Sequence, residues 1–221
     1  MVPRKVLSRR GVSNVGFTLI ELLISMSIMA IILGITFSGG PQSVRRLALS
    51  DTTFQAEIMV REAQLQGSAI NSLNDKYGGT GVFFSRALPK QFLKFRDIVD
   101  TSVQRAIPVG NGLYDSAPED EKEFIYATTR NIKIGKLCVA TSTSPLLCDN
   151  AVVPPIDTLT VSFNRPKQTA NIYINSTTTT NYTFACIQID APEAPLLGYV
   201  KSILVYRSGM ITKISGVCTL P

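Results

Sequence analysis

The sequence predicts an α+β protein in which a long N-terminal α-helix precedes a β-rich head of antiparallel strands, arranged as a two-sheet sandwich. Two observations carry this prediction. Residues 17–37 form one apolar run, and from about Thr80 the apolar residues recur with the two-residue period of strands instead of the period of a helix. We expect three consecutive parts, a basic N-terminal segment, the helix and the head: residues 1–16, 17–73 and 74–221.

The composition allows a folded head and argues against an enzyme. With 45% hydrophobic and 17% charged residues, the 221-residue chain has enough apolar material for a core. It contains no histidine, the commonest general base near neutral pH and the commonest zinc ligand. Four of the six net positive charges lie before residue 17, in a stretch without acidic residues. The basic character therefore belongs mainly to the N-terminal segment.

The apolar run has the properties of a membrane-spanning helix. Residues 17–37 match the length of helix that crosses the hydrocarbon core of a bilayer. Because Lys and Arg next to an apolar span stay on the cytoplasmic side, we expect the head outside the cytoplasmic membrane. A secretory signal peptide would have a shorter apolar core, followed by a small-residue cleavage site. An ordinary signal anchor would have no reason to keep Glu21, the only charged residue of the run.

The junction between the basic segment and the apolar run carries a recognisable motif. The sequence GFTLIE at residues 16–21 resembles the motif of type IV prepilins and type II secretion pseudopilins, in which a basic leader ends in Gly, followed by Phe and then by Glu. The resemblance implies that a membrane aspartyl peptidase cleaves between Gly16 and Phe17 and that Phe17 is methylated. It also implies a structural subunit, of minor pilin or pseudopilin type, that leaves the inner-membrane lipid to join other subunits in a pilus or a periplasmic pseudopilus.

Glu21 is the candidate assembly residue. A carboxylate near the middle of a bilayer costs about 2.5–3.5 kcal/mol on insertion scales, so its presence suggests a partner. In the family the matching glutamate faces the N-terminal amine of a neighbouring subunit, which exists only after the leader is removed, and a low dielectric strengthens that attraction. The alternative is that Glu21 reaches the cytoplasmic interface from its place near the start of the helix.

The sequence predicts that the helix continues beyond the membrane to about Ser72. Residues 39–41 read Gly-Gly-Pro and should kink or locally melt it. Beyond them, apolar residues at separations of seven and four share one helix face: Leu47, Phe54, Ile58, Leu65 and Ala69. In the family the outer half of this helix packs against the head. Three basic residues off the stripe are interpreted as a solvated or subunit-facing surface: Arg45, Arg46 and Arg61.

Nine segments of the head predict strands, because β-branched and aromatic residues alternate in them between turn residues. They are 81–84, 91–98, 123–128, 131–140, 157–164, 170–175, 182–190, 199–207 and 210–215. Many short strands favour antiparallel packing of sheets. Their order resembles the two-sheet head of the H-type minor pseudopilins.

The four cysteines, an even number without a C-x-x-C pair, favour disulfides in an oxidising compartment. The alternative is four reduced, buried cysteines that act as small apolar residues. Of three conceivable pairings, Cys138–Cys148 is favoured because it closes a short loop after a strand, and this leaves Cys186 and Cys218 for each other.

Calcium is the one cofactor that the sequence suggests. Hard oxygen donors gather around one predicted loop, and calcium takes six to eight such ligands. The candidates are Asp97, Asp100, Asn111 and Asp115. Some pseudopilins hold calcium in a comparable loop. The spacing does not match an EF-hand, however, and the same residue types serve turns and solubility.

A DNA-binding competence pilin is the main functional alternative, since some relatives of this architecture take up DNA. It requires a basic surface that neutralises several phosphates. One predicted strand and its flank combine basic with aromatic residues: Lys90, Phe92, Lys94, Phe95 and Arg96. Alternation explains the same stretch as one strand with a polar and an apolar face.

Overall fold

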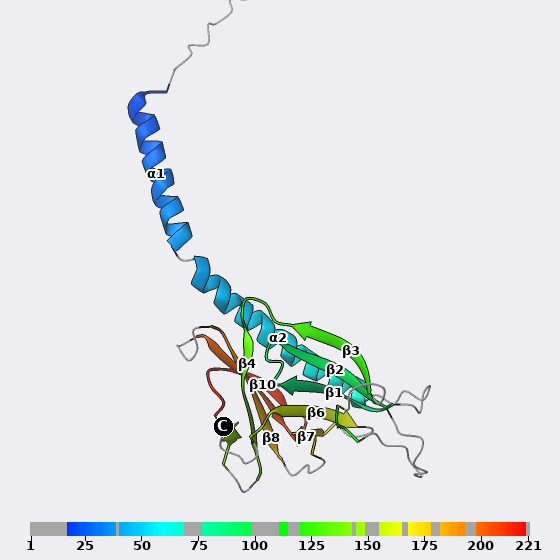
Figure 1. The fold of residues 1–221 in the computed structure, drawn as a ribbon. Helices are drawn as coiled ribbons and strands as arrows, with labels where there is room; N and C mark the ends of the chain where they lie inside the picture. Colours follow the sequence, from blue (N-terminus) through cyan, green and yellow to red (C-terminus); the bar gives the residue numbers. More distant parts are fainter. Residues whose placement is uncertain are drawn as a thin grey trace, which may run out of the picture. The chain divides into compact units, whose positions relative to one another are not determined.

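The computed structural model describes residues 17–38, 40–68, 77–98, 111–114, 120–142, 145–148, 155–164, 168–177, 182–192 and 198–219. The chain divides into two compact units, Met1–Gln42 and Ser43–Pro221. The basic N-terminal segment, including Gly16, lies outside the described residues. The predicted α+β class is confirmed: an apolar N-terminal helix is followed by a β-rich head with two antiparallel sheets (Figure 1).

Two described helical elements cover the region predicted as one helix with a break at Gly-Gly-Pro. Helix α1 spans Leu19–Ser38 and helix α2 spans Gly40–Ser68, and Gly39 between them lies outside the described residues. Pro41 falls in the first turn of α2, where a missing backbone N–H removes no intrahelical hydrogen bond. The predicted end of the helix near Ser72 lies outside the described residues.

The head contains two five-stranded antiparallel sheets, with strand orders β3-β2-β1-β6-β7 and β10-β9-β8-β4-β5. Each of the nine predicted segments overlaps one strand. The tenth, β5, was missed because two residues carry no periodicity. The strands are β1 Tyr77–Ser85, β2 Gln91–Ile98, β3 Asp120–Ala127, β4 Lys133–Ala140, β5 Leu147–Cys148, β6 Thr158–Asn164, β7 Ala170–Ile174, β8 Phe184–Asp190, β9 Val200–Tyr206 and β10 Ile211–Ser215.

One apolar core joins the two sheets and α2. Buried side chains from all three belong to the same cluster, among them Phe84, Phe92 and Phe163 from the first sheet, Leu137, Ile187 and Ile203 from the second, and Leu49, Val60 and Ala63 from α2. Full burial of one large apolar side chain stabilises a fold by about 1.5–3 kcal/mol. Helix α2 is therefore part of the head and not an appendage to it.

The face of α2 that packs on the head is not the predicted apolar stripe. The packed face consists of small and medium side chains with no exposed surface: Leu49, Thr53, Ala56, Val60 and Ala63. Gly67 continues this face, and a Cβ added to it would lie 2.3 Å from the carbonyl oxygen of Phe163. Small residues thus let the helix backbone approach the sheet closely.

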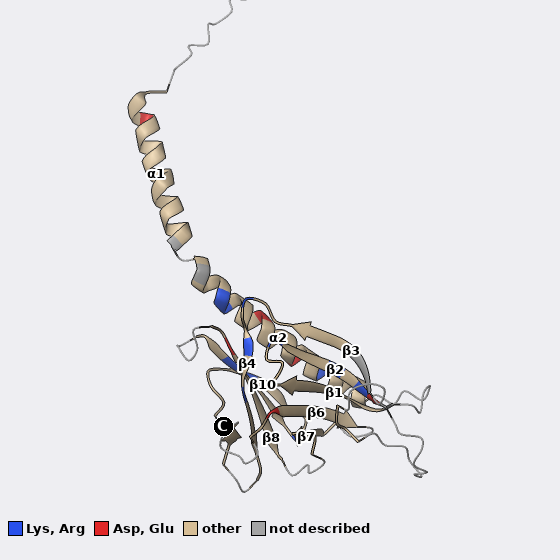
Figure 2. Cartoon of the chain, viewed as in Figure 1, with Lys and Arg blue, Asp and Glu red and all other residues tan. Residues whose placement is uncertain are grey.

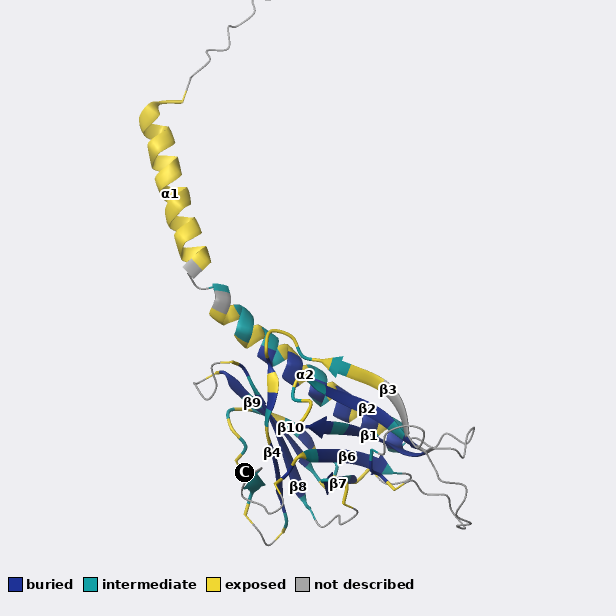
Figure 3. Cartoon of the chain, viewed as in Figure 1, coloured by how far each residue is buried: buried dark blue, intermediate teal, exposed yellow. Residues whose placement is uncertain are grey.

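The predicted stripe is instead exposed. Leu47, Phe54, Ile58 and Leu65, hereafter the α2 stripe, are 69, 47, 39 and 70% exposed, and Ala69 lies outside the described residues. Two residues turn about 200° around a helix axis, so Ile58 lies opposite the buried Val60. Helix α2 consequently has one apolar face packed on the head and another that is exposed, and Figure 3 shows buried and exposed residues alternating along it.

Polar contacts also fasten α2 to both sheets. Lys94 on β2 forms an ion pair of 2.7 Å with Glu62, and Gln64 donates a hydrogen bond of 2.9 Å to the carbonyl of Gly209. Arg61, interpreted from the sequence as solvated or subunit-facing, donates a hydrogen bond of 3.1 Å to the carbonyl of Ile211. That interpretation of Arg61 is incomplete, because its guanidinium ties α2 to β10.

Candidate functional site

The start of α1 is fixed by a cap directly after Phe17. The Thr18 hydroxyl accepts a hydrogen bond of 3.3 Å from the backbone N–H of Glu21, and the Thr18 carbonyl accepts one of 3.2 Å from the N–H of Leu22. Thr followed three residues later by Glu is the sequence pattern of a capping box. The cap places the Glu21 carboxylate in the first helical turn, where the helix dipole favours a negative charge.

The other polar side chains of α1 satisfy their hydrogen-bonding groups within the helix. The hydroxyls of Ser25, Ser27 and Thr36 donate hydrogen bonds of 2.9, 2.8 and 3.0 Å to carbonyls one turn earlier. Such bonds let a hydroxyl enter an apolar environment without an unpaired donor. The Glu21 carboxylate has no such bond and no ion pair within the described part of the chain. Within the described residues, Glu21 is thus exposed and its carboxylate has no partner.

The apolar side chains of α1 are also unpartnered. Every side chain described from Phe17 to Phe37 is exposed, as Figure 3 shows. An 18-residue window of this helix has a mean hydropathy of 2.3 and no buried share, and no second helix among the described residues is long and apolar enough to cross a membrane. A helix that is apolar on all sides and not covered by its own chain requires an apolar environment from outside.

Comparison with known proteins identifies the same segment. Residues 16–37 match the family model of the prokaryotic N-terminal methylation motif. No curated protein and no solved structure matches the chain. The chain thus carries the prepilin methylation motif, which supports a type IV pilin-like or pseudopilin subunit. Proteins with this motif are structural subunits and not enzymes, and an apolar N-terminal helix that carries it fits a membrane-anchored pilin.

The cysteines of the head form two disulfides, Cys138–Cys148 and Cys186–Cys218, the pairs that the sequence analysis favours. Cys138 on β4 lies opposite Cys186 on the neighbouring strand β8. All four sulfurs belong to a second apolar cluster, separate from the main core. Because disulfides persist in oxidising compartments, they fit a head outside the cytoplasm.

Two of the four residues considered for calcium binding, Asp97 and Asn111, are described, and each accepts a hydrogen bond from a backbone N–H. The carboxylate of Asp97 is buried and accepts a hydrogen bond of 2.6 Å from the N–H of Gly112. The side chain of Asn111 accepts one of 2.8 Å from the N–H two residues further on. Asp100 and Asp115 lie outside the described residues. Among the residues that are described, no group of three or more His, Cys, Asp or Glu side chains could hold a metal ion.

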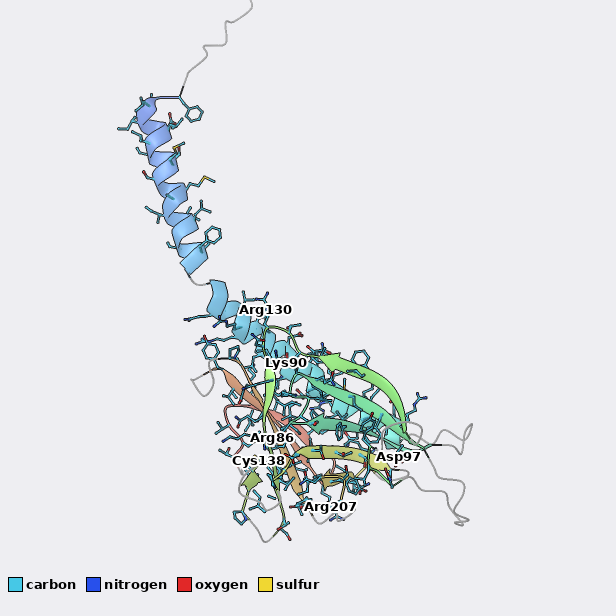
Figure 4. All side chains as sticks on the ribbon, in the orientation of Figure 1. Arg86, Lys90, Asp97, Arg130, Cys138 and Arg207 are labelled. Atoms are coloured by element: carbon cyan, nitrogen blue, oxygen red, sulfur yellow. A yellow bond between two sulfur atoms is a disulfide. The ribbon has the colours of Figure 1, made fainter. Side chains whose placement is uncertain are left out.

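Asp97 anchors the segment 111–114 on the first sheet, and Figure 4 labels its position. Gly112 has a φ of 77°, and a Cβ at that position would lie 2.6 Å from the hydroxyl of Tyr173. Only glycine fits such an approach. Burial raises the pKa of Tyr173, and the nearby Asp97 carboxylate raises it further. Asp97, Gly112 and Tyr173, hereafter the clamp, thus hold the segment 111–114 on the first sheet, and the Asp97 carboxylate is the buried charge among them.

Three residues of the basic-aromatic stretch considered for DNA binding, Phe92, Lys94 and Phe95, are buried in the head. Phe92 and Phe95 are buried in the head, so no base can stack on their rings. Lys94 is 5% exposed and is paired with Glu62. Alternation of two strand faces therefore explains Phe92, Lys94 and Phe95, while Lys90 in the flank is exposed and Arg96 is half-buried.

An open groove lies beside the α2 stripe. It has a volume of about 450 Å³ and is lined by Gln55, Ile58, Met59, Glu62, Gln66, Lys94 and Phe124. Phe124 belongs to the edge strand β3 and is 54% exposed. The groove and the α2 stripe share Ile58, and the groove combines apolar with polar and charged side chains.

Proposed function

We propose that this chain is a membrane-anchored structural subunit, of minor pilin or pseudopilin type, of a type IV pilus or a type II secretion pseudopilus. A prepilin peptidase removes residues 1–16, α1 holds the mature protein in the inner membrane, and the subunit then joins other subunits in a filament outside the cytoplasm. The observation that carries the proposal is the methylation motif over residues 16–37, on a helix whose apolar side chains are exposed.

Glu21 sets the position of the subunit in the filament by pairing with the N-terminal amine of Phe17 on an adjacent subunit. The hydroxyls of Ser25, Ser27 and Thr36 donate hydrogen bonds within the helix. The Glu21 carboxylate has no partner among the described residues. Two unit charges about 4 Å apart attract by about 4 kcal/mol at an effective dielectric constant near 20. That attraction is comparable to the roughly 2.5–3.5 kcal/mol cost of placing a charge in the membrane. Cleavage creates the amine and thereby permits assembly.

The two faces of α2 support the same role. A helix that served only the head would direct its large apolar residues inward, whereas the α2 stripe directs four of them outward. Burying this stripe against neighbouring subunits removes apolar surface from water, the main favourable contribution to association. Helix α2 would thus stabilise the head on one side and the filament on the other.

A substitution at Glu21 tests the proposal. In a strain that expresses only the variant, Glu21→Val should insert into the membrane and be cleaved, because the helix becomes more apolar, but it should be absent from sheared filaments. Ser25→Val is the matched control, since it removes a polar group that is already bonded within the helix; it should enter filaments normally. If Glu21→Val is incorporated at the wild-type ratio to the other subunits, the pairing is wrong.

Immunogold labelling of sheared filaments separates the roles that a subunit of this kind can have. Label along the whole length indicates a major subunit, and label confined to the tips indicates a minor one. Filaments on the cell surface indicate a pilus, whereas label retained in the periplasm indicates a secretion pseudopilus.

A further inference from the structure

The end of the head next to the start of α2 can be located from direct contacts. The Arg46 guanidinium lies 5.1 Å from the centre of the Tyr199 ring, and the Lys201 ammonium donates a hydrogen bond of 2.9 Å to the hydroxyl of Ser50. The first residues of β9 therefore lie beside residues 46–50 of α2. Residues 46–50 are the part of the head that is closest in sequence to α1.

Strand register brings further segments to the same end. Lys133 at the start of β4 lies opposite Asp190, which in turn lies opposite Val200 at the start of β9. The turn before β4 is fastened to the β1–β2 connection, because Lys90 donates a hydrogen bond of 3.0 Å to Asn131. The two connections and the start of β4 thus lie at the same end of the head as the start of β9, which contacts α2.

Exposed cations gather on this end of the head. Arg46, Lys90, Arg130 and Lys133, hereafter the basic rim, come from α2, the β1–β2 connection, the β3–β4 connection and β4, and all four side chains are exposed. Figure 4 labels Lys90 and Arg130, and Figure 2 shows the charges along the chain. The acidic residues described near the rim are Asp51 and Asp190, and Asp190 accepts a hydrogen bond from Gln188. The rim therefore has a net positive charge.

We propose that the basic rim binds the phosphate groups of anionic phospholipids on the extracytoplasmic surface of the membrane before the subunit is assembled. The proposal rests on the membrane anchoring proposed above. Arg46 is eight residues beyond Ser38, the last residue of α1, a path of about 12 Å if helical and at most about 29 Å if fully extended. The headgroup layer itself extends about 5–8 Å beyond the hydrocarbon core. In an anchored chain, Arg46 therefore lies within this path length of the end of α1, within reach of lipid phosphates.

Two features favour a lipid surface over a nucleic acid. The aromatic residues of β2 that could stack on bases, Phe92 and Phe95, are buried. By contrast, Leu88 is 51% exposed two residues before Lys90 in the same connection, and an apolar side chain beside cations suits the boundary between headgroups and acyl chains. The anchor also gives lipid a high effective concentration that a soluble polyanion does not have.

The full chain in lipid nanodiscs tests the proposal. All four cysteines are disulfide-bonded, so Thr129→Cys provides a single thiol for a fluorophore on the exposed turn beside Arg130. Nanodiscs are made from phosphatidylcholine alone or with phosphatidylglycerol, each with a quencher on a fraction of the headgroups. We expect stronger quenching with phosphatidylglycerol, and its loss at about 1 M salt, where the Debye length is about 3 Å.

Charge-matched variants localise the effect. Arg130→Asn with Lys133→Gln should lower the ratio of bound to free heads about fivefold per charge removed, and Asn suits the positive φ of 54° at position 130. The control, Arg207→Gln with Lys213→Gln, removes two charges after β9 and on β10 and should leave quenching unchanged.

Three results would overturn the proposal. Quenching could be equal in both lipids, or it could fall equally in the two double variants. Duplex DNA at physiological salt could also abolish the quenching by displacing the rim from the lipid, which would indicate a nucleic-acid surface. Insertion of α1 is scored separately by co-purification with the nanodisc. A chain that fails to insert contradicts the proposed anchoring, whereas a chain that inserts without phosphatidylglycerol-dependent quenching contradicts only the role of the rim.

Discussion

The side chains of helix α1 and those of the head have opposite environments. From Phe17 to Phe37 every described side chain of the α1 unit is exposed, whereas the core of the head includes side chains with no exposed surface at all, such as Phe84 and Val60. The head is closed further by two disulfides. The comparison indicates that the head is stabilised by its own chain, while the side chains of α1 are not covered by the described residues and, under the proposed function, contact lipid and other subunits.

This difference separates the expected effects of mutations. A substitution in or before α1 should change processing, location or assembly and leave the stability of the head unchanged. A substitution in the core of the head should lower its melting temperature and leave processing unchanged. Substitutions in helix α2 should give either effect, because one of its faces is buried in the head and the other, the α2 stripe, is exposed.

The largest effect is expected at the cleavage site. Glycine gives a peptidase an unhindered and conformationally permissive peptide bond, so Gly16→Leu should abolish removal of the leader, and the unprocessed protein should stay in the membrane. Mass spectrometry of the N-terminus measures the outcome, and Val15→Leu serves as a control for added bulk one residue earlier. A head that melts at an unchanged temperature in Gly16→Leu supports the separation of the two regions. Normal processing of this variant would contradict the assigned site.

Substitutions on the two faces of α2 should give smaller effects, on the stability of the head for the buried face and on assembly for the α2 stripe. Val60→Ala removes buried methyl groups and should destabilise the head by about 2 kcal/mol, seen as a lower melting temperature of the full chain in detergent. Leu65→Ala changes a side chain that is 70% exposed and should alter stability by less than about 0.5 kcal/mol. Leu65→Ala should instead lower the amount of the subunit in sheared filaments. Equal loss of stability in both variants would show that the α2 stripe belongs to the head.

The sequence predicted best those elements whose environment is uniform. The apolar run of α1 needs no tertiary information, because its length and composition alone identify a candidate membrane span. The nine long strands were also predicted, since alternation along 81–84 or 91–98 follows directly from a half-buried sheet. Cys138 and Cys148 were paired from their short separation.

The packed face of α2 could not be found by looking for large apolar residues. Leu49, Thr53, Ala56, Val60 and Ala63 follow one another at separations of four and three, a spacing that identifies one helix face. Threonine and alanine carry little hydrophobicity, so the larger residues of the opposite stripe dominated the interpretation. The ion pair of the buried Lys94 with Glu62 could not be predicted either, because it depends on how α2 lies on β2.

The smallest effect concerns the clamp on the first sheet. The pKa of Tyr173 is raised above 10.0 by burial and by the Asp97 carboxylate, so the folded head favours the neutral phenol. This contribution is fully present below pH 10.0, the value for the unfolded chain, and is lost as the pH rises through the folded pKa, with a slope of at most about 1.4 kcal/mol per pH unit. Tyr173→Phe should make the alkaline decrease in melting temperature shallower. Some decrease remains, since burial also raises the pKa of Tyr182. Tyr126→Phe on β3 is the control, and an alkaline slope reduced equally by both substitutions would show that the Tyr173–Asp97 contact is not its source.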